Sequence, residues 1–231
     1  MILNGMGRGR FLLLITFDVY TALFDIEGSL LPVVNEVSNM DALSFIRAWR
    51  SKQLEYALIS NSLGPVRIPF EELTRRSLDD TLFRHKLTVT AAAYDSLRRA
   101  WLSLRPWGEA AEVLTSLKER GHILGLLSNG DTALLHELMK KLPPVFEYVF
   151  SSEQAGYYKP HPSIYELPFQ TLDLRGGDLL HVAGSPTDVL GAKSAGLRCA
   201  WSNRFGQPYL DLNLRADHEM KDLRGLLRIP T

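Results

Sequence analysis

Asp18 has the side chain and the position of a reacting carboxylate. It directly follows an apolar run, residues 11–17, and such a run predicts a buried parallel strand. Ligands bind at the carboxyl ends of the strands in open α/β sheets, so a carboxylate at this point favours nucleophilic or acid–base chemistry. Asp18 could instead cap a turn or pair with a lysine, and its position alone is compatible with both interpretations.

Three other polar segments come at or just after predicted strands. They contain Ser128 with Asn129, then Lys159, and finally Asp188. Because the carboxyl ends of parallel strands meet at one edge of a sheet, we expect these side chains to lie near Asp18. Each segment alone is a weak signal, since Ser-Asn-Gly and Lys-Pro occur in many turns.

The second half of the chain alternates between strands and helices. Strands are predicted at residues 122–127, 145–150, 179–183 and 198–201. Helices are predicted between Pro106 and Gly121, from after Gly130 to about residue 142, at 162–172 and at 186–195. Pro168 is expected to end or kink the third of these helices early. The alternation predicts a parallel sheet with right-handed crossovers.

Residues 31–104 have a different pattern, with helices predicted at 39–60, 70–86 and 91–104 and no clear strand. Because this block follows the first strand, we expect it to be inserted above the sheet edge, where it could close on a substrate. The sequence therefore predicts an α/β protein. Its Rossmann-like parallel-sheet core would comprise residues 1–30 and 105–231, and residues 31–104 would form an inserted all-helical cap.

The composition limits the classes of function. The 26 basic and 26 acidic residues give a formal net charge of zero, so the chain lacks the basic excess that is typical of nucleic-acid binding. No segment reaches the roughly 20 apolar residues of a membrane span, and the N-terminal apolar run has no small-residue cleavage site of a signal peptide. The single cysteine, Cys199, excludes an intrachain disulfide and favours a reducing compartment, the cytoplasm. Four of the six histidines were considered as metal ligands, but their spacing is not that of a metal site and no role is predicted for them: His85, His122, His161 and His181.

In this order, the segments around Asp18, Ser128-Asn129, Lys159-Pro160 and Asp188 have the four-motif layout of a known superfamily. The chain resembles the haloacid dehalogenase-like hydrolases over nearly its whole length.

Two positions separate the chain from the phosphatases of that superfamily. These phosphatases carry a second aspartate two residues after the nucleophile, where this chain has Tyr20. They also carry an acidic magnesium ligand four residues before the last motif aspartate, where this chain has Gly184. Mg²⁺ prefers carboxylate ligands, so the loss of one argues against a metal-dependent phosphoryl-transfer site.

The resemblance narrows to the L-2-haloacid dehalogenases of type II. Residues 17–20 and 23–25, the cap segment 49–56, and Tyr158-Lys159-Pro160 followed by Tyr165 are similar to that group. The match in the cap carries the most weight, because caps vary between branches of the superfamily.

The resemblance implies how the first half of the reaction would proceed. Asp18 would attack C2 of a short 2-haloacid and form an ester with inversion, while Lys159 keeps Asp18 ionised. Arg50 would reach from the cap and receive the halide, for which a weakly hydrated guanidinium is suited. Backbone N–H groups at Ser128 and Asn129 would bind the substrate carboxylate.

The resemblance also implies supporting roles. Asp188 would orient or activate the water that hydrolyses the ester. Tyr20 and Tyr165 would line the pocket and orient Arg50 or the substrate, and Ser185 would partly replace a polar group that dehalogenases carry nearby. The substrate would be a small halogenated carboxylic acid, with no metal or other cofactor, and a homodimer through the cap is expected by analogy.

The chain departs from the dehalogenases at Thr21-Ala22, where they have Gly-Thr. Ala22 cannot supply the threonine's hydrogen bond. Thr21 could supply it from the neighbouring position, but its β-branch is expected to strain a turn with positive φ.

Alternatives therefore stay open. The chain could be a phosphatase with an altered motif, or a catalytically silent relative that binds a small acid or a protein. Arg50 could be a solvated helix residue, Tyr165 could only pack its helix, and Asp188 could be a simple first-turn acid.

Overall fold

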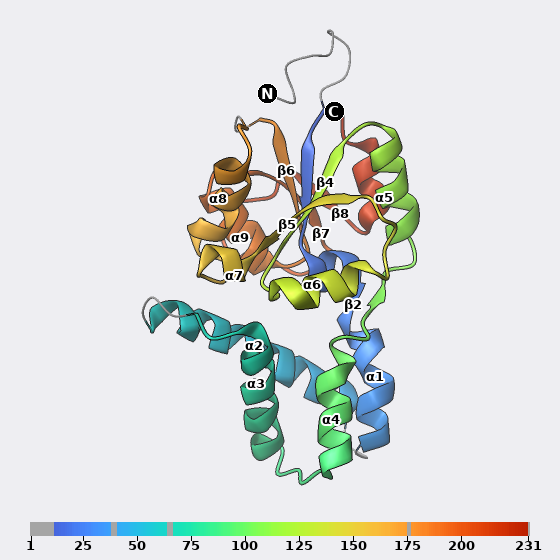
Figure 1. Ribbon diagram of the computed structural model, residues 1–231, viewed down its shortest axis with the longest axis vertical. Coiled ribbons are helices and arrows are strands. Elements are labelled where there is room, and N and C mark those ends of the chain that lie inside the picture. The colour runs from blue at the N-terminus through green and yellow to red at the C-terminus, as the bar shows by residue number, and fades with distance from the viewer. Residues whose placement is uncertain (1–11, 38–40, 64–66, 175–176, 231) are drawn as a thin grey trace.

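The computed structural model describes residues 12–37, 41–63, 67–174 and 177–230. A parallel six-stranded sheet forms the upper part of the molecule in Figure 1, in the order β5-β4-β1-β6-β7-β8. The strands are β1 (Leu14–Phe17), β4 (Ile123–Ser128), β5 (Phe146–Ser151), β6 (Leu179–Ala183), β7 (Arg198–Ser202) and β8 (His218–Met220). The predicted α/β class with a parallel sheet is confirmed.

Helices cover both faces of the sheet (Figure 1). They are α5 (Ala110–Glu119), α6 (Thr132–Met139), α7 (Ser152–Ala155), α8 (Pro162–Thr171), α9 (Pro186–Ser194) and the 3-10 helix η2 (Leu223–Arg228). Alternate residues of β1 divide between two apolar clusters: Ile15 and Phe17 pack in the cluster that includes α5, α6 and η2, while Leu14 packs in the cluster that includes α8 and α9.

The expectation that Pro168 ends its helix early was wrong. Helix α8 continues through Pro168, whose carbonyl accepts a hydrogen bond from the Leu172 N–H at 3.0 Å. Proline inside a helix costs about 3 kcal/mol, but Ile164, Tyr165 and Pro168 form a buried face, and the burial of that face offsets the cost. The three-residue strand β8 and the helix η2 were not predicted.

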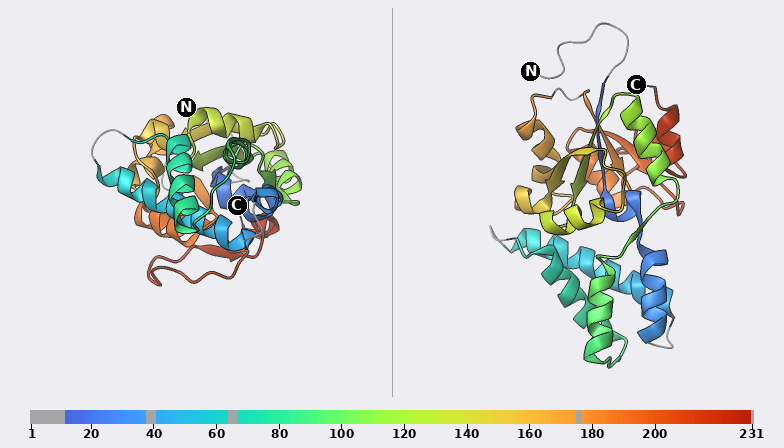
Figure 2. Two further views of the ribbon diagram at one scale, coloured as in Figure 1. Left: turned by 90° about the horizontal axis from the view of Figure 1, so that it is seen from below. Right: turned by 45° about the vertical axis from the view of Figure 1, so that its right-hand side comes forward.

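Helices alone form the lower part of the molecule, below the carboxyl ends of the strands (Figure 1; Figure 2, right). They are α1 (Ile26–Val37), α2 (Ala42–Ser62), α3 (Phe70–Arg84) and α4 (Ala91–Ala100). The short antiparallel strands β2 (Phe24–Asp25) and β3 (Arg105–Pro106) connect them to the sheet. In the ranges that the structure describes, no helix has the length and apolar character needed to cross a membrane.

Helix α1 was not predicted, because Gly28 and Pro32 lie inside it. The Asp25 side chain accepts the Gly28 N–H at 2.8 Å and so caps the first turn. A side chain at position 28 would collide with this cap, since a Cβ there would lie 2.1 Å from Asp25 Oδ2. The helix thus depends on a local cap that overrides weak propensity. The division of the chain at residues 31 and 104 stays a prediction.

Candidate active site

Asp18 lies at the junction of β1 and the π-helical turn η1 (Val19–Leu23) and is only 7% exposed. Its Oδ2 accepts hydrogen bonds from the backbone N–H of Thr21 at 3.1 Å and from Thr21 Oγ1 at 2.9 Å. Both bonds fix the rotation of the carboxylate. The carboxylate therefore points in one defined direction.

The expectation of a strained turn at Thr21 was wrong. Among the described residues, Lys86 is the one non-glycine residue with a positive φ. Because η1 is a right-handed helical turn, Thr21 needs no glycine-like conformation. Its hydroxyl reaches Asp18, as the sequence left open, and Ala22 is not needed for this bond.

Lys159 lies between two carboxylates. Its Nζ is 3.3 Å from Asp18 Oδ1 and 3.0 Å from Asp188 Oδ2, and all three side chains are buried. Burial alone would raise the pKa of Asp188, but Lys159 and His181 outweigh it and hold that pKa well below its ordinary value. Asp188 is therefore a firmly ionised, weakly basic carboxylate.

Asp188 is positioned from two further sides. Ser185 caps helix α9, and its Oγ accepts the Asp188 N–H at 3.3 Å. The Tyr165 hydroxyl donates to Asp188 Oδ1 at 2.8 Å, so Tyr165 orients this carboxylate as well as packing α8 on the sheet. Asp188 is therefore both an acidic residue in the first turn of α9 and part of the charged cluster that Asp18, Lys159 and Asp188 form.

Asn129 connects the end of β4 with the Lys159 loop. Its Oδ1 accepts the Lys159 N–H at 2.7 Å, and its carbonyl accepts the Ser152 hydroxyl at 2.7 Å. Ser128 is fully buried, and its Oγ accepts the Gly130 N–H at 3.4 Å. These bonds hold the loops beside Asp18, while carboxylate binding by Ser128 and Asn129 stays a prediction.

Arg50 comes from α2 of the cap and is not on a solvated face. Its guanidinium carbon lies 5.3 Å from the Tyr20 ring centre and 5.7 Å from that of Trp101, and it donates to Gln53 Oε1. Burial lowers the pKa of Arg50, and the negative charge of Asp18 opposes this. Gln53, for which no role was predicted, is fully buried and donates to Thr74 Oγ1 at 2.5 Å, so it anchors Arg50 to α3.

Tyr20 belongs to an aromatic cluster between η1 and the cap. Its ring stacks on Phe70 with centres 5.0 Å apart and meets Trp101 edge-on. Its hydroxyl oxygen is buried and has no hydrogen-bond partner among the described residues. Burial raises the pKa of this hydroxyl well above its ordinary value, so it stays protonated and able to donate.

His181 is the principal site residue that the sequence analysis missed. It is fully buried on β6, with Nε2 3.0 Å from Asp188 Oδ2 and Nδ1 3.0 Å from Thr16 Oγ1. A signal existed: a histidine interrupts an apolar strand, two residues before the strand ends. Its partners lie 165 and 7 residues away, so spacing alone could not identify them.

The position of the phosphatase metal ligand has no room for an acid. A Cβ on Gly184 would lie 2.3 Å from both Ala22 N and Thr21 Oγ1. Any side chain there would displace the turn that holds Asp18. Within the described ranges, no three His, Cys, Asp or Glu side chains are grouped so that they could hold a metal ion.

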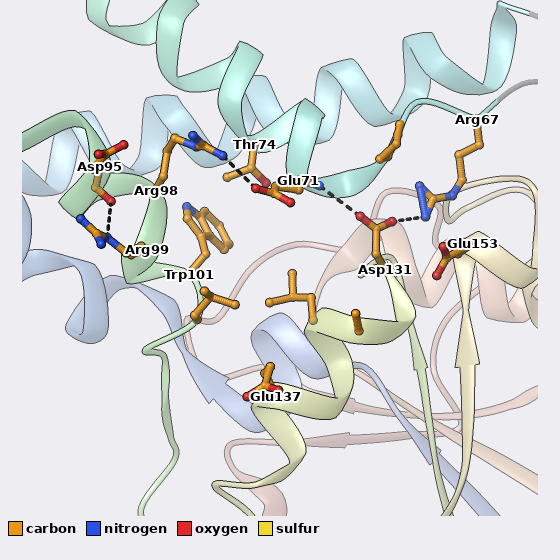
Figure 3. Close-up of a pocket in the computed structure, with 14 residues that line it drawn as sticks. Arg67, Glu71, Thr74, Asp95, Arg98, Arg99, Trp101, Asp131, Glu137 and Glu153 are labelled. Carbon is orange, nitrogen blue, oxygen red and sulfur yellow. Dashed lines mark hydrogen bonds and ion pairs between the residues drawn. The ribbon is translucent and has the colours of Figure 1, made fainter. Parts of the chain in front are cut away.

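A cleft of about 740 Å³ lies between the cap and the core (Figure 3). Its lining includes Thr74 and Trp101, which also contact Gln53 and Arg50. Asp131 extends across it from the start of α6. The cleft therefore lies beside the side chains that hold Arg50, while Asp18, Arg50, Lys159 and Asp188 do not line it.

Asp131 caps a helix of the opposite part of the molecule. Helix α3 begins after Pro69, which provides no side-chain cap. Instead, Asp131 accepts the N–H groups of Phe70 at 3.1 Å and Glu71 at 3.2 Å, and it pairs with Arg67 (Figure 3). The cap and the core are thus joined by a charged N-cap beside the site.

We expect Asp131→Ala to lower the free energy of unfolding by about 1–2 kcal/mol, because α3 loses its cap and Arg67 its partner. Amide exchange at Phe70 and Glu71 should accelerate more than exchange in the sheet. Urea unfolding and hydrogen exchange measure both effects. Asp131→Asn keeps an acceptor and should lose less, whereas equal exchange rates in Asp131→Ala and wild type would contradict the assignment.

Known proteins resemble this chain in sequence and in fold. The model of the haloacid dehalogenase-like hydrolase family matches residues 19–196. Haloacetate dehalogenase H-2 from Moraxella sp. (strain B) is 33% identical over 93% of this chain and 96% of its own length. The (S)-2-haloacid dehalogenase of Pseudomonas sp. (strain YL) is 30% identical over 93% of both chains.

A solved L-2-haloacid dehalogenase superposes with a TM-score of 0.89 at 28% identity, covering 94% of this chain and 97% of that one. Fold and sequence confirm the predicted resemblance. The chain belongs to the haloacid dehalogenase-like hydrolase family.

Proposed function

We propose that this hydrolase dehalogenates a short (S)-2-haloacid without a metal ion, through an ester on Asp18, and releases halide and the inverted 2-hydroxy acid. One observation carries the proposal: Asp18 is buried, fixed by Thr21 and paired with Lys159, while a cap arginine held between aromatic rings faces it. The similarity to haloacetate and (S)-2-haloacid dehalogenases supports it.

In the first step, an Asp18 oxygen forms a bond to C2 as the carbon–halogen bond breaks, and the halide leaves with the bonding electrons. Attack from the side opposite the halogen inverts C2. Arg50 receives the halide, and Lys159 keeps Asp18 ionised before attack. Ser128 and Asn129, just before α6, are proposed to hold the substrate carboxylate.

In the second step, water adds to the acyl carbon of the Asp18 ester. The bond between that carbon and the ester oxygen, which is now bonded to C2, breaks. One proton of the water goes to that oxygen and one to solvent, which restores the Asp18 carboxylate. Asp188 is proposed to orient this water, because it is ionised and buried beside Lys159. The C2–oxygen bond stays intact, so the product keeps the inverted configuration.

Two alternatives lose their motivation. A phosphatase would need an acid at position 184, where no side chain fits. The silent relative was motivated by Thr21-Ala22, yet Thr21 binds Asp18 by its own hydroxyl. A small haloacid substrate remains the proposed partner, and the homodimer stays a prediction.

We expect halide release from L-2-chloropropionate or from bromo- or fluoroacetate, undiminished by EDTA. In a single turnover in ¹⁸O-water, the label should enter Asp18 rather than the hydroxy acid, because water attacks the acyl carbon. Ion chromatography and mass spectrometry of the Asp18 peptide measure these outcomes. No halide from any of the three acids, or label found only in the product, would overturn the proposal.

A further inference from the structure

His181 is a buried polar residue that neither the nucleophile nor the halide site requires. It lies on β6 opposite Thr16 of β1 in the sheet register, and both side chains are fully buried. Its ring meets Asp188, the proposed water-orienting carboxylate, at 3.0 Å. A buried histidine in direct contact with a reacting group needs a physical account.

The hydrogen bonds around His181 determine which nitrogen carries the proton. Nε2 lies 3.0 Å from Asp188 Oδ2, which is ionised and can only accept, and 3.4 Å from the Lys159 ammonium, which can only donate; the shorter contact places the proton on Nε2. Nδ1 is then an acceptor, and Thr16 Oγ1 donates to it at 3.0 Å. The Nε2 N–H consequently points at Asp188 Oδ2, and Thr16 maintains that tautomer.

The donors to Asp188 leave little of its surface free. Oδ2 receives Lys159 Nζ and His181 Nε2, each at 3.0 Å, and Oδ1 receives the Tyr165 hydroxyl at 2.8 Å. A carboxylate has about four acceptor positions, so three side-chain donors leave about one. His181 therefore helps decide which position remains open to a water molecule.

We propose that His181 is a positioning residue for ester hydrolysis: its Nε2–H fixes the Asp188 carboxylate so that one acceptor position is directed at the attacking water. This inference rests on the proposed dehalogenase function and deepens it. Its main effect is on the second step, because both Thr21 hydrogen bonds hold Asp18 without His181. His181 reaches the nucleophile only through Lys159, whose Nζ lies 3.4 Å from Nε2.

The titratable groups at the contact between His181 and Asp188 and around it come from four elements and one loop. Asp18 follows β1, Lys159 lies in the loop before α8, Tyr165 is on α8, Asp188 is on α9, and Cys199 is the register partner of His181 on β7. Lys159 lowers the pKa of Asp188 through its charge and its hydrogen bond, and His181 lowers it through the hydrogen bond from Nε2. Loss of the histidine should therefore raise the pKa of Asp188. As the pH falls, activity that needs ionised Asp188 should then disappear at a higher pH than in the wild type.

The test separates the two steps of the reaction. In His181→Phe we expect a normal burst of about one halide per protein, followed by turnover that is about tenfold or more slower. The ester on Asp18 should accumulate and be visible in the intact-protein mass. The acid limb of the kcat profile should move to higher pH.

Three further variants keep the test decisive. His181→Gln retains a donor near the Nε2 position and should restore most of the turnover, whereas Thr16→Val removes the hydroxyl that sets the tautomer and should slow turnover mildly in the same step. If His181→Phe does not fold, these two variants decide. Cys199→Ala makes a cavity on the adjacent strand, beside His181, and should leave the ratio of burst to turnover unchanged.

The outcomes for the two proposals differ. No halide from the wild-type protein would refute the dehalogenase function itself. Wild-type turnover, with burst, steady-state rate and pH profile unchanged in His181→Phe, would overturn the role of His181 alone. Equal slowing in the Gln and Phe variants would also overturn it, because packing rather than the N–H would then be responsible.

Discussion

Replacing Asp18 with asparagine should abolish halide release from every haloacid that the wild-type protein accepts. An amide oxygen is too weak a nucleophile to displace halide from C2, and we expect a loss of about a thousandfold or more in kcat. Asparagine still offers an oxygen to the N–H and hydroxyl of Thr21, so the turn η1 should remain folded. Halide release and intact-protein mass are the measurements, and no ester adduct should form.

A matched control shows that the loss is local. Asp222→Asn changes a carboxylate of the same kind, which caps η2 on the far side of the core, and should leave halide release unchanged. Substantial release by Asp18→Asn would mean that water attacks C2 directly. In that case the ¹⁸O label from a single turnover would appear in the hydroxy acid.

Exchanging Lys159 for methionine should have the second largest effect, on both activity and stability. Asp18 and Asp188 would then lie buried without the ammonium that joins them. Removing one partner of a buried ion pair costs about 3–5 kcal/mol, part of which is recovered if a carboxylate takes up a proton. Activity at neutral pH should fall about a hundredfold or more, since a protonated Asp18 is no nucleophile.

The pH dependence of stability gives this prediction a sign. In the wild type, the folded-state pKa of Asp188 lies below its ordinary value, so its contribution to stability is complete above about pH 4 and disappears as the pH falls. In Lys159→Met we expect the folded-state pKa of Asp188 to lie above its ordinary value, which reverses the sign of the change in stability with pH. The variant should lose stability as the pH rises from about 4 to 7, where the contribution of Asp188 in the wild type is constant.

Urea unfolding at several pH values tests this reversal. Lys159→Arg keeps the positive charge and should retain the wild-type slope. Lys193→Met removes a more exposed pair with Asp217 and should cost about 1 kcal/mol or less without changing activity. Parallel stability–pH curves for wild type and Lys159→Met would show that Lys159 does not set the ionisation of these carboxylates.

Much of the architecture was predictable because parallel strands buried on both faces are nearly continuous apolar runs. Residues 123–127 and 179–183 have this pattern and form β4 and β6. Strand β8 has the sequence His-Glu-Met, which carries no such signal, and it pairs only because β7 presents an open edge. Helix α8 passes Pro168 because tertiary burial outweighs a local penalty that sequence patterns treat as decisive.

The sequence by itself determined the order of the chemical groups and the elements that carry them. Asp18 and Asp188 meet at one sheet edge because they come after β1 and β6 of the same parallel sheet, and that arrangement follows from apolar patterning and chain direction. Lys159 joins them from the loop between α7 and α8. Arg50 was identified from the resemblance in the cap helix, and α2 brings it over Tyr20.

Only the tertiary structure decided how these groups are held. Thr21 binds Asp18 because η1 is a π-helical turn, and the residue types of this segment do not predict that conformation. His181 meets Thr16 and Asp188, and Asp131 caps α3, through contacts between residues that are mostly far apart in the sequence. Local propensity acts over a few residues, whereas the direction of a buried hydrogen bond depends on how whole elements pack. These hydrogen-bond partners are therefore determined by the packing of the strands and the cap, and the sequence alone does not identify them.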